Sequence, residues 1–327
     1  MATFIPLRSA PRALGIAIAL AGALTAGCGV DSATQPDDLD LSAIAFAYAT
    51  DSTSRNLDIY AVPVDGSTVR RIVTSPEIEA YPDWSPDGQT LLFTRISRGT
   101  QQNPVQRASL WTVRADGTEL RELTAGLGYS FGGRWSPDGQ SIVFETGEYP
   151  AFSIGVMRAD GTGWHTVASA SVTDAYSQPT WSPDGRIAFQ RTTAEWRGIW
   201  TMSSDGSGLI RLTGGDDSEP RWSPDGKQLV FSRQFLSGTG SASVLVVANA
   251  DGSRLRQLTG GPYDRIPAWS PDGRWIIYDG RVLFGNRTSC PLYKVFAAGS
   301  LPVNFLPQRT RAGCSGSAWR ASPGAPR

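Results

Sequence analysis

The sequence predicts an all-β fold made of one four-stranded unit repeated around a ring. Three observations support this prediction: a recurring motif, a constant order of segments around it, and a composition rich in turn-forming residues. The motif WSPDG occurs five times, at 84–88, 135–139, 181–185, 222–226 and 269–273. The 36 Gly and 22 Pro residues fit many short strands joined by tight turns and argue against a helical bundle. Together these features predict a six-bladed β-propeller with four-stranded antiparallel blades.

Each repeat contains the same segments in the same order. Successive motif tryptophans lie 51, 46, 41 and 47 positions apart (135−84, 181−135, 222−181, 269−222), which is the length of a propeller blade. A strand ends in Trp, and the SPDG turn, an apolar triplet, a second apolar segment, a DG turn and a short last segment follow. The triplets are LLF (91–93), IVF (142–144), IAF (187–189), LVF (229–231) and IIY (276–278). Because the triplets are apolar throughout, both faces of each strand should be buried between neighbouring blades.

The two ends of the chain are expected to share one blade. Residues 43–49, 57–66 and 69–74 match the second, third and fourth strands of a unit, and no first strand precedes them. Near the C-terminus, GSAWRASPG (316–324) resembles a decayed copy of the motif. We therefore expect residues of about 315–321 to form the innermost strand of the first blade. This pairing brings the count to six blades and closes the ring, which leaves no long exposed sheet edge.

The N-terminal segment predicts export. Arg8 and Arg12 precede the small and apolar run 13–27, which has the order of a secretory signal and is short for a membrane span. The run ends in LTAGC, which resembles the lipobox of bacterial lipoproteins, so Cys28 is the expected lipidation site. The alternative is ordinary cleavage that leaves Cys28 as a free thiol. The expected organisation is a signal peptide (1–27), a lipidated tether (28–41), the propeller (42–321) and a flexible tail (322–327).

With the repeats in place, the six units resemble the β-propeller repeats of the TolB-like family, which are related to the WD-repeat pattern. The resemblance covers about residues 42–321 and depends on the five intact WSPDG copies. TolB itself carries an α/β domain before its propeller, whereas here only the tether lies between Cys28 and the first strand. The resemblance therefore implies the propeller, but none of the functions tied to that extra domain.

The motif itself is expected to have a structural role and not to form a functional site. In SPDG, Ser can bond the turn backbone, Pro presets φ, Asp tolerates the third position and Gly takes the left-handed fourth. The sequence contains a single histidine, His165, and no nucleophile elbow, P-loop or metal-binding pattern. Lys+Arg and Asp+Glu are balanced at 30 each, which argues against a nucleic-acid partner. We therefore expect no catalytic residues, no cofactor and no metal.

The two remaining cysteines are expected to pair. Once Cys28 is lipidated, Cys290 and Cys314 are an even number in an oxidising compartment, where a disulfide is the default. A metal pair lacks the close spacing and histidine partners of a zinc site. Cys290 ends a loop between second and third strands and Cys314 lies between blades, so both should lie on one face of the disc.

Ligand binding is expected on the face that carries the varied loops. The SPDG and DG turns should share one plain face, whereas the loops between second and third strands and between blades share the other. The segments that enter the inner strands from this decorated face combine aromatic and charged residues, including Glu79, Arg134, Asp217 and Asp264. The candidate ligand-binding residues are Tyr81, Tyr129, Phe131, Tyr176, Glu219, Arg221, Tyr263 and Arg265. In the alternative reading, the tyrosines only pack loops and the charges pair among themselves.

Two functions follow as hypotheses. The first is a monomeric, non-enzymatic lipoprotein on the periplasmic face of the outer membrane, whose propeller binds an envelope protein, peptide or glycan at the channel mouth. The second is an enzyme, either a polysaccharide lyase or hydrolase or a prolyl-oligopeptidase relative that lacks its hydrolase domain. Glu219 and Arg221 would be the first catalytic candidates of the second hypothesis.

Overall fold

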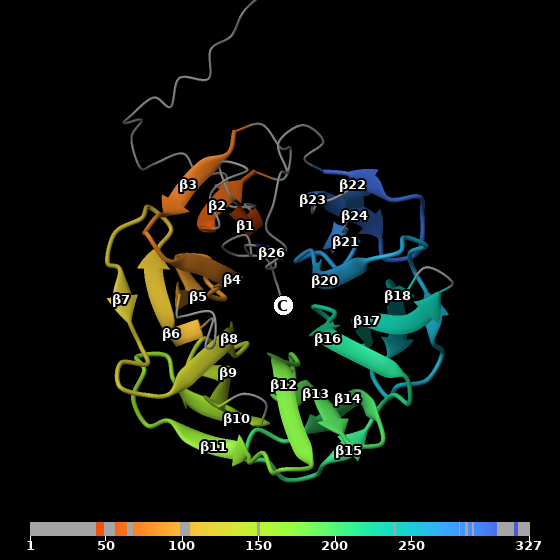
Figure 1. Ribbon diagram of the computed structural model, residues 1–327, viewed down its shortest axis with the longest axis horizontal. Helices are drawn as coiled ribbons and strands as arrows, with labels where there is room; N and C mark the ends of the chain where they lie inside the picture. The colour runs from red at the N-terminus through yellow and green to blue at the C-terminus, as the bar shows by residue number, and fades with distance from the viewer. Residues whose placement is uncertain are drawn as a thin grey trace, which may run out of the picture. The chain divides into compact units, whose positions relative to one another are not determined.

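The fold of the chain is given by a computed structural model. The structure describes residues 44–48, 56–63, 68–98, 105–148, 151–237, 240–280, 282–284, 287–289, 291–305 and 317–319. Over these residues it contains six four-stranded antiparallel sheets and no helix. Figure 1 shows the sheets arranged around a common axis, so the predicted six-bladed β-propeller is confirmed.

The blades follow one another along the chain. Blade 1 contains β26 (Ser317–Trp319), β1 (Ile44–Tyr48), β2 (Asp58–Val62) and β3 (Arg70–Val73). Blade 2 contains β4 (Ile78–Trp84), β5 (Thr90–Arg98), β6 (Val105–Arg114) and β7 (Arg121–Glu122). Blade 3 contains β8 (Tyr129–Trp135), β9 (Ser141–Glu148), β10 (Ala151–Arg158) and β11 (His165–Ala168).

Blade 4 contains β12 (Asp174–Trp181), β13 (Ile187–Thr193), β14 (Arg197–Met202) and β15 (Ile210–Arg211). Blade 5 contains β16 (Asp216–Trp222), β17 (Gln228–Ser237), β18 (Gly240–Asn249) and β19 (Arg256–Gln257). Blade 6 contains β20 (Asp264–Trp269), β21 (Trp275–Gly280), β24 (Leu292–Phe296) and β25 (Val303–Asn304). A separate hairpin of β22 (Val282–Phe284) and β23 (Arg287–Ser289) is inserted between β21 and β24.

The ring is closed by the C-terminal strand, as predicted. β26 pairs antiparallel with β1, with Ser317 opposite Phe46 and Ala318 opposite Ala45. Figure 1 shows β26 at the inner edge of blade 1, the position that the first strand occupies in every other blade. Closure therefore removes the free inner edge of β1, as a propeller requires.

The core consists of six hydrophobic clusters, one between each pair of neighbouring blades. Each cluster takes apolar residues from the second and third strands of two blades, and the triplet residues Leu91, Leu92 and Phe93 of blade 2 are fully buried. The motif tryptophans pack in these clusters; Trp84 lies between blades 1 and 2, and Trp222 lies between blades 4 and 5. Since the triplets meet neighbours on both sides, their unbroken apolar pattern is explained.

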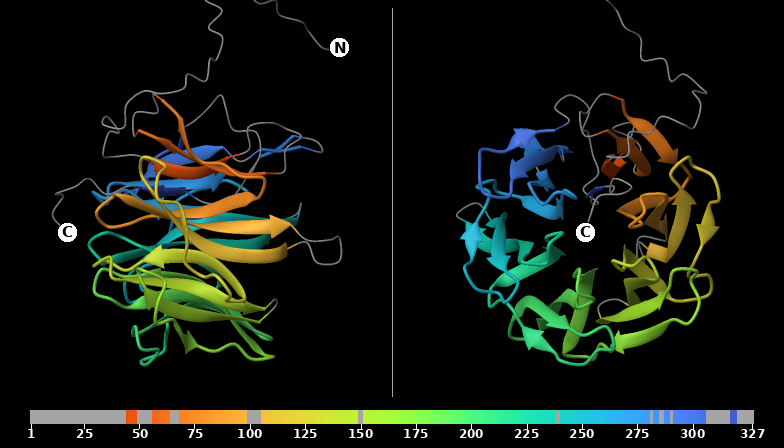
Figure 2. Two further views of the ribbon diagram at one scale, coloured as in Figure 1. Left: turned by 90° about the vertical axis from the view of Figure 1, so that its left-hand side faces the viewer. Right: turned by 180° about the vertical axis from the view of Figure 1, so that it is seen from behind.

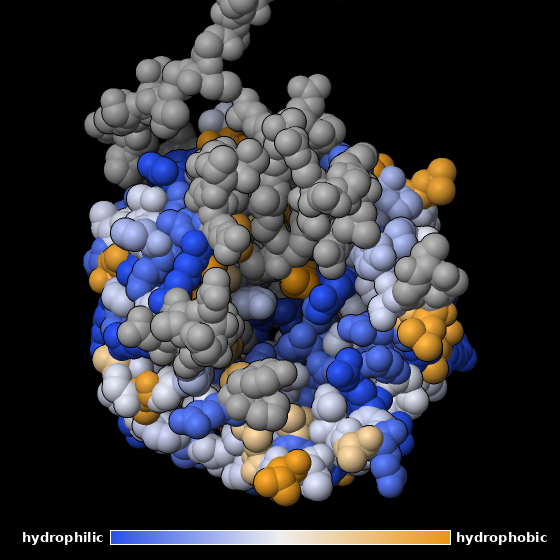
Figure 3. All heavy atoms as spheres, in the orientation of Figure 1, coloured by the Kyte–Doolittle hydropathy of each residue, from blue (hydrophilic) through white to orange (hydrophobic). Residues whose placement is uncertain are grey.

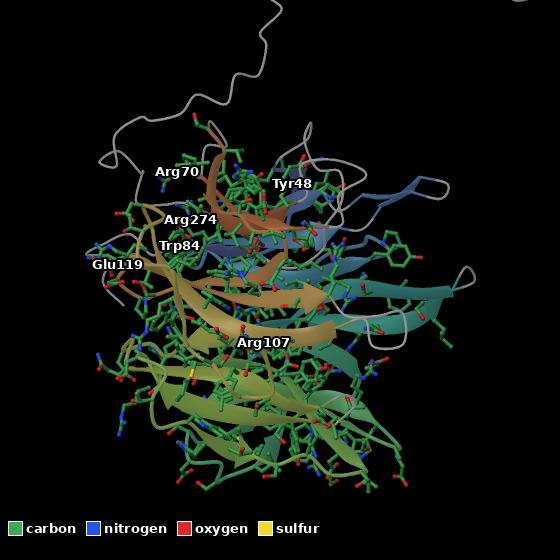
Figure 4. All side chains as sticks on the ribbon, turned by 60° about the vertical axis from the view of Figure 1, so that its left-hand side comes forward. Tyr48, Arg70, Trp84, Arg107, Glu119 and Arg274 are labelled. Atoms are coloured by element: carbon green, nitrogen blue, oxygen red, sulfur yellow. The ribbon has the colours of Figure 1, made fainter. Side chains whose placement is uncertain are left out.

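The SPDG motif acts as a turn. In the first copy, Ser85 Oγ donates to Asp87 Oδ1 at 2.6 Å and accepts from the Thr90 N–H at 2.9 Å, while Gly88 has φ of +68°. The other copies repeat the Ser–Asp bond and the positive φ of Gly. In Figure 4, Glu119 of a turn between third and fourth strands and Arg274 of a turn between first and second strands lie on the same side of the disc. Figure 2 shows the long second-to-third-strand hairpins on the opposite side.

The DG turns also contact the preceding blade, which gives a stability prediction. A Cβ on Gly252 (φ +81°) in blade 5 would collide with the main-chain carbonyl of Leu212 in blade 4, whereas a Cβ on Gly185 (φ +83°) would meet open space. Gly185→Ala should therefore cost only the left-handed conformation, about 1 kcal/mol. Gly252→Ala should cost about 3 kcal/mol, because it adds an inter-blade collision.

Urea unfolding of both variants and of the wild type measures this difference. Because the two glycines have nearly the same φ, Gly185→Ala is the matched control for backbone strain. Equal destabilisation by the two substitutions would contradict the inter-blade role of the DG turn.

Candidate functional site

Each of the inner strands β4, β8, β12, β16 and β20 contains a bulge at the same place. Two residues of the inner strand lie opposite one residue of the second strand, and that residue is the aromatic that ends the apolar triplet. The first bulge residue has a left-handed backbone, with φ of 52° to 58°, at Tyr81, Gly132, Gln178, Glu219 and Ile266. For a bulky or β-branched residue this conformation is strained. Such bulges redirect side chains, and repeated strain of this kind is concentrated at functional sites.

The five bulge residues line one cavity of about 760 Å³. Its other walls include the hairpin of β17 and β18, through Gln234 and residues 241–243, and Phe152 of β10. Figure 3 shows the face of the disc with the long hairpins, where hydrophilic residues surround a central hollow. The varied loops of the decorated face and the bulges of the inner strands therefore meet at one site.

The structure brings together six of the eight predicted ligand-binding residues. The cavity-lining six are Tyr81, Phe131, Glu219, Arg221, Tyr263 and Arg265. Tyr129 does not line the cavity and stacks on Phe131, with ring centroids 6.2 Å apart. Tyr176 is 9% exposed and packs in the core between blades 3 and 4, 5.7 Å from the Phe189 ring.

The acidic residues expected near the mouth have structural partners. Glu79 is fully buried and pairs with Arg95 at 3.2 Å, and Asp217 holds Arg233 through two bonds of 2.7 and 2.9 Å. For these residues, the alternative in which charges pair among themselves is correct. Sequence reasoning missed Glu145 and Asp279, which come from the second strands and line the cavity. Each of them pairs with the inner-strand residue that directly precedes the bulge, Glu145 with Phe131 and Asp279 with Arg265, and this position in the repeat could have identified them.

Side chains of one blade hold the bulge backbone of the next. The Gln178 N–H donates to Glu145 Oε1 at 2.9 Å, the Glu219 N–H donates to Gln178 Oε1 at 2.7 Å, and the Ile266 N–H donates to Glu219 Oε2 at 2.7 Å. In blade 3 the Gly132 N–H donates to Thr94 Oγ1 at 3.0 Å. These bonds satisfy main-chain donors that the bulges remove from the sheet ladder. The strained bulges are therefore fixed by their neighbours.

Glu219 is fully engaged in this network. Its Oε1 accepts from Arg265 Nη2 at 2.7 Å, and its Oε2 accepts from Ser232 Oγ and the Ile266 N–H, each at 2.7 Å. The residue is 4% exposed. A carboxyl group that accepts three hydrogen bonds, one of them from an arginine, is fixed in place by its neighbours. Glu219 thus links residues of the cavity wall through hydrogen bonds and is poorly suited to act as a general acid or base.

Arg134, Arg221 and Glu145 line the cavity, and both arginines act on the charge of Asp83. Burial raises the pKa of Glu145 to about 7 and raises the pKa of Asp83, although Arg134 and Arg221 act in the opposite direction. Burial and the charge of Arg134 lower the pKa of Arg221 to about 9. Burial therefore disfavours the charged forms of Glu145, Asp83 and Arg221. A group that titrates near neutral pH is present in the candidate site.

Other chemistry is not concentrated at the cavity. His165 is exposed and borders a separate depression of about 590 Å³ beside the turns of the plain face. Within the described part of the chain, no group of three His, Cys, Asp or Glu residues is arranged to hold a metal ion. A search of the same residues finds no helix with the length and apolar character of a membrane span. Cys28, Cys290 and Cys314 lie outside the described residues.

The fold and the site define a propeller whose inner strands form a mixed aromatic and charged cavity at one face. The chain matches the family described as the TolB beta propeller domain over residues 33–216 and 178–307. It therefore belongs to this family of β-propeller proteins.

Individual relatives agree with this assignment. The chain is 27% identical over 190 residues to an uncharacterized protein of Agrobacterium fabrum, over 54% of this chain and 62% of that protein. It is 35% identical over 118 residues to the Tol-Pal system protein TolB of Anaeromyxobacter dehalogenans, over 36% of this chain and 25% of that protein. The crystal structure of TolB from Acinetobacter baumannii is similar in fold, with a TM-score of 0.66 and 19% identity over 85% of this chain and 66% of that chain. The matches thus span less than two thirds of these relatives.

The raised pKa of Glu145 predicts a pH-dependent stability difference. Its folded pKa of about 7 lies above the unfolded value of about 4.3, so the folded state binds more protons between these pH values. Wild-type stability should therefore fall as pH rises through this window. Glu145→Gln keeps an oxygen acceptor for the Gln178 N–H and removes the charge. After allowance for channel solvent, we expect the variant to be more stable by about 1–2 kcal/mol at pH 8, with the difference shrinking toward pH 5.

Urea unfolding at pH 5, 6.5 and 8 tests this prediction. Glu195→Gln, at an exposed position outside the cavity, is the control and should change little at any pH. A Glu145→Gln variant that is less stable than the wild type at pH 8, or a difference that does not vary with pH, would show that Glu145 is not a destabilised anion.

Proposed function

We propose that the protein is a binding module of the bacterial cell envelope and that its propeller holds a protein, peptide or glycan in the cavity at the channel mouth. The observation that carries this proposal is the set of left-handed bulges, strained at four of five positions, whose residues differ from blade to blade and line one cavity. A purely structural repeat would favour the same unstrained residue at each position. Variation at a costly backbone position is instead typical of a site selected for its side chains.

The lining has the chemistry of a recognition surface. Aromatic residues such as Tyr81, Phe131 and Tyr263 offer large contact areas, and Gln178 and Gln234 offer amide groups beside charged residues. Aromatic anchors with interspersed polar groups are characteristic of protein and ligand interfaces. The volume of about 760 Å³ accommodates several residues of an extended chain or a short oligosaccharide.

Binding is favoured over catalysis by the state of the first catalytic candidate. Both carboxylate oxygens of Glu219 accept hydrogen bonds from the cavity wall, and His165 lies at the other depression. Among the described residues that line the cavity, no serine hydroxyl is seen hydrogen-bonded to a carboxylate or histidine that could act as its base. This supports the non-enzymatic hypothesis over a lyase, hydrolase or peptidase relative.

The envelope location rests on the N-terminal sequence and on the family. The proposed lipid on Cys28, the tether 28–41 and the proposed Cys290–Cys314 disulfide all fit an exported, membrane-anchored protein. Relatives that carry the name of a Tol-Pal system protein agree with this placement. We propose the periplasmic face of the outer membrane as the location, with the protein as a monomer.

Replacement of two cavity-lining aromatics tests the binding function. Capture from solubilised envelope fractions should be lost in a Tyr81→Ala/Tyr263→Ala double variant, because both rings line the cavity. Trp164→Ala, at a 47% exposed residue beside a DG turn, is the matched aromatic control on the plain face and should capture the same ligand as the wild type. Equal capture by the wild type and the double variant would remove the cavity as the binding site.

Lipid anchoring has its own test. Cys28→Ser should abolish metabolic labelling with a palmitate analogue and move the protein from the membrane fraction to the soluble envelope fraction. Unchanged membrane association of Cys28→Ser, with the signal peptide removed, would contradict the anchor while leaving the propeller site untouched.

A further inference from the structure

Two arginines occupy equivalent positions on inner strands. Arg134 and Arg221 directly precede the motif tryptophans of blades 3 and 5, and both line the cavity. The same position holds Asp83, Thr180, Ala268 and Ala318 in the other blades. At this position, directly before the Trp that ends each inner strand, two blades therefore carry a guanidinium group. Three of the four remaining blades carry a small or neutral residue there.

Neither guanidinium forms an ion pair with a residue that the structure describes. Arg221 Nη1 donates to the Pro220 carbonyl at 2.7 Å, and Arg134 Nη1 donates to the Gly133 carbonyl at 3.1 Å, with Tyr81 O and Pro82 O at 3.4 and 3.5 Å. The ion pairs formed around the cavity use other arginines, such as Arg265. In the described contacts each guanidinium thus uses one nitrogen, Nη1, and uses it on main-chain carbonyls. The remaining N–H groups form a fork that suits a carboxylate.

The neighbouring acids accept hydrogen bonds from main-chain N–H groups. Asp83 Oδ2 accepts from the Trp135 N–H at 2.9 Å, and Glu145 Oε1 accepts from the Gln178 N–H at 2.9 Å. Arg134 is only 7% exposed, and its charge acts on Arg221. The acids Asp83, Glu219 and Glu145 offset part of the repulsion between the two guanidinium groups, and a bound anion would offset more of it.

We propose that Arg134 and Arg221 together bind one carboxylate of an acidic peptide segment that enters the cavity. This inference rests on the proposed binding function and names the chemistry of its ligand. A monoanion fits better than a dianionic phosphate, because Asp83, Glu219 and Glu145 also act on Arg221. The two arginines recognise the charge and shape of the carboxylate, next to the aromatic residues that line the cavity.

The upper lining favours a peptide over a sugar acid. Ile266 and Ala242 line the cavity, and Leu236 is 88% exposed at the tip of the β17–β18 hairpin, paired with the cavity-lining Ser241. Aliphatic surface complements peptide side chains and does not complement hydroxyl groups. We therefore place an extended segment with an apolar residue at the mouth and its carboxylate at the arginines.

Calorimetric titration of the purified chain with small probes tests the site at pH 7 and constant ionic strength. The probes are acetyl-Leu-Gly-Asp-amide, acetyl-Leu-Gly-Asn-amide, acetyl-Leu-Gly-Gly with a free C-terminal carboxylate, glucuronate and sulfate. We expect the Asp peptide to bind at least about tenfold more tightly than the isosteric Asn peptide. Equal or tighter binding of the free C-terminus would assign the carboxylate to a chain end and would still support the arginine site.

Substitution of the arginines is the second part of this experiment. Arg221→Gln should weaken binding of the Asp peptide at least about tenfold, and Arg221→Lys should weaken it less, because the charge remains while the fork is lost. Arg134→Lys provides a second position with a conservative change. Arg186→Gln removes an exposed arginine that pairs with Asp184 on the plain face, and should bind like the wild type. Thermal unfolding of each variant verifies that it is folded.

Three results would overturn the inference. They are equal binding of the Asp and Asn peptides, undiminished binding by folded Arg221→Gln and Arg134→Lys variants, and tighter binding of glucuronate or sulfate than of either carboxylate peptide. Each of them leaves the proposed function standing if envelope capture still depends on Tyr81 and Tyr263. Loss of that dependence while the Asp peptide binds would contradict the proposed function instead.

Discussion

The hydrogen bonds that cross between blades at the inner-strand bulges are the interaction on which the rest of the structure depends. A bulge takes main-chain N–H groups out of the sheet ladder, and these donors need other hydrogen-bond partners. The partners are side chains of the preceding blade, as in the bond from Ile266 N–H to Glu219. The bulge is therefore stable only within the closed ring, and the ring in turn positions the bulge side chains around one cavity.

This arrangement separates framework from function within every repeat. The tryptophan, the SPDG turn and the apolar triplet are nearly constant, because they fill the same inter-blade cluster or form the same turn each time. The bulge residue is free to vary, because its backbone is held by the neighbour while its side chain faces the cavity. The variation among Tyr81, Gln178 and Glu219 is therefore compatible with an unchanged fold.

The sequence was sufficient for the fold because its strongest periodic signal is set by packing. The blade count and the pairing of β26 with β1 both follow from the tryptophan spacing and the truncated first unit. The site was only partly predictable, because the bulge changes which side chains face the channel. Tyr176 precedes the bulge by two residues and points between blades, whereas Tyr81 lies on the bulge and faces the cavity. Glu145 was missed because it reaches the site from a second strand, through register that only the folded sheet defines.

Hydrogen exchange measured with and without the ligand captured from envelope fractions tests the central claim most directly. If the ligand occupies the cavity, peptides that cover the inner strands β8, β12 and β16 should exchange more slowly in the complex, together with the tip of the β17–β18 hairpin. The five WSPDG turns should exchange at unchanged rates. Protection of those turns, with the inner strands unaffected, would place the binding surface on the plain face and contradict the account.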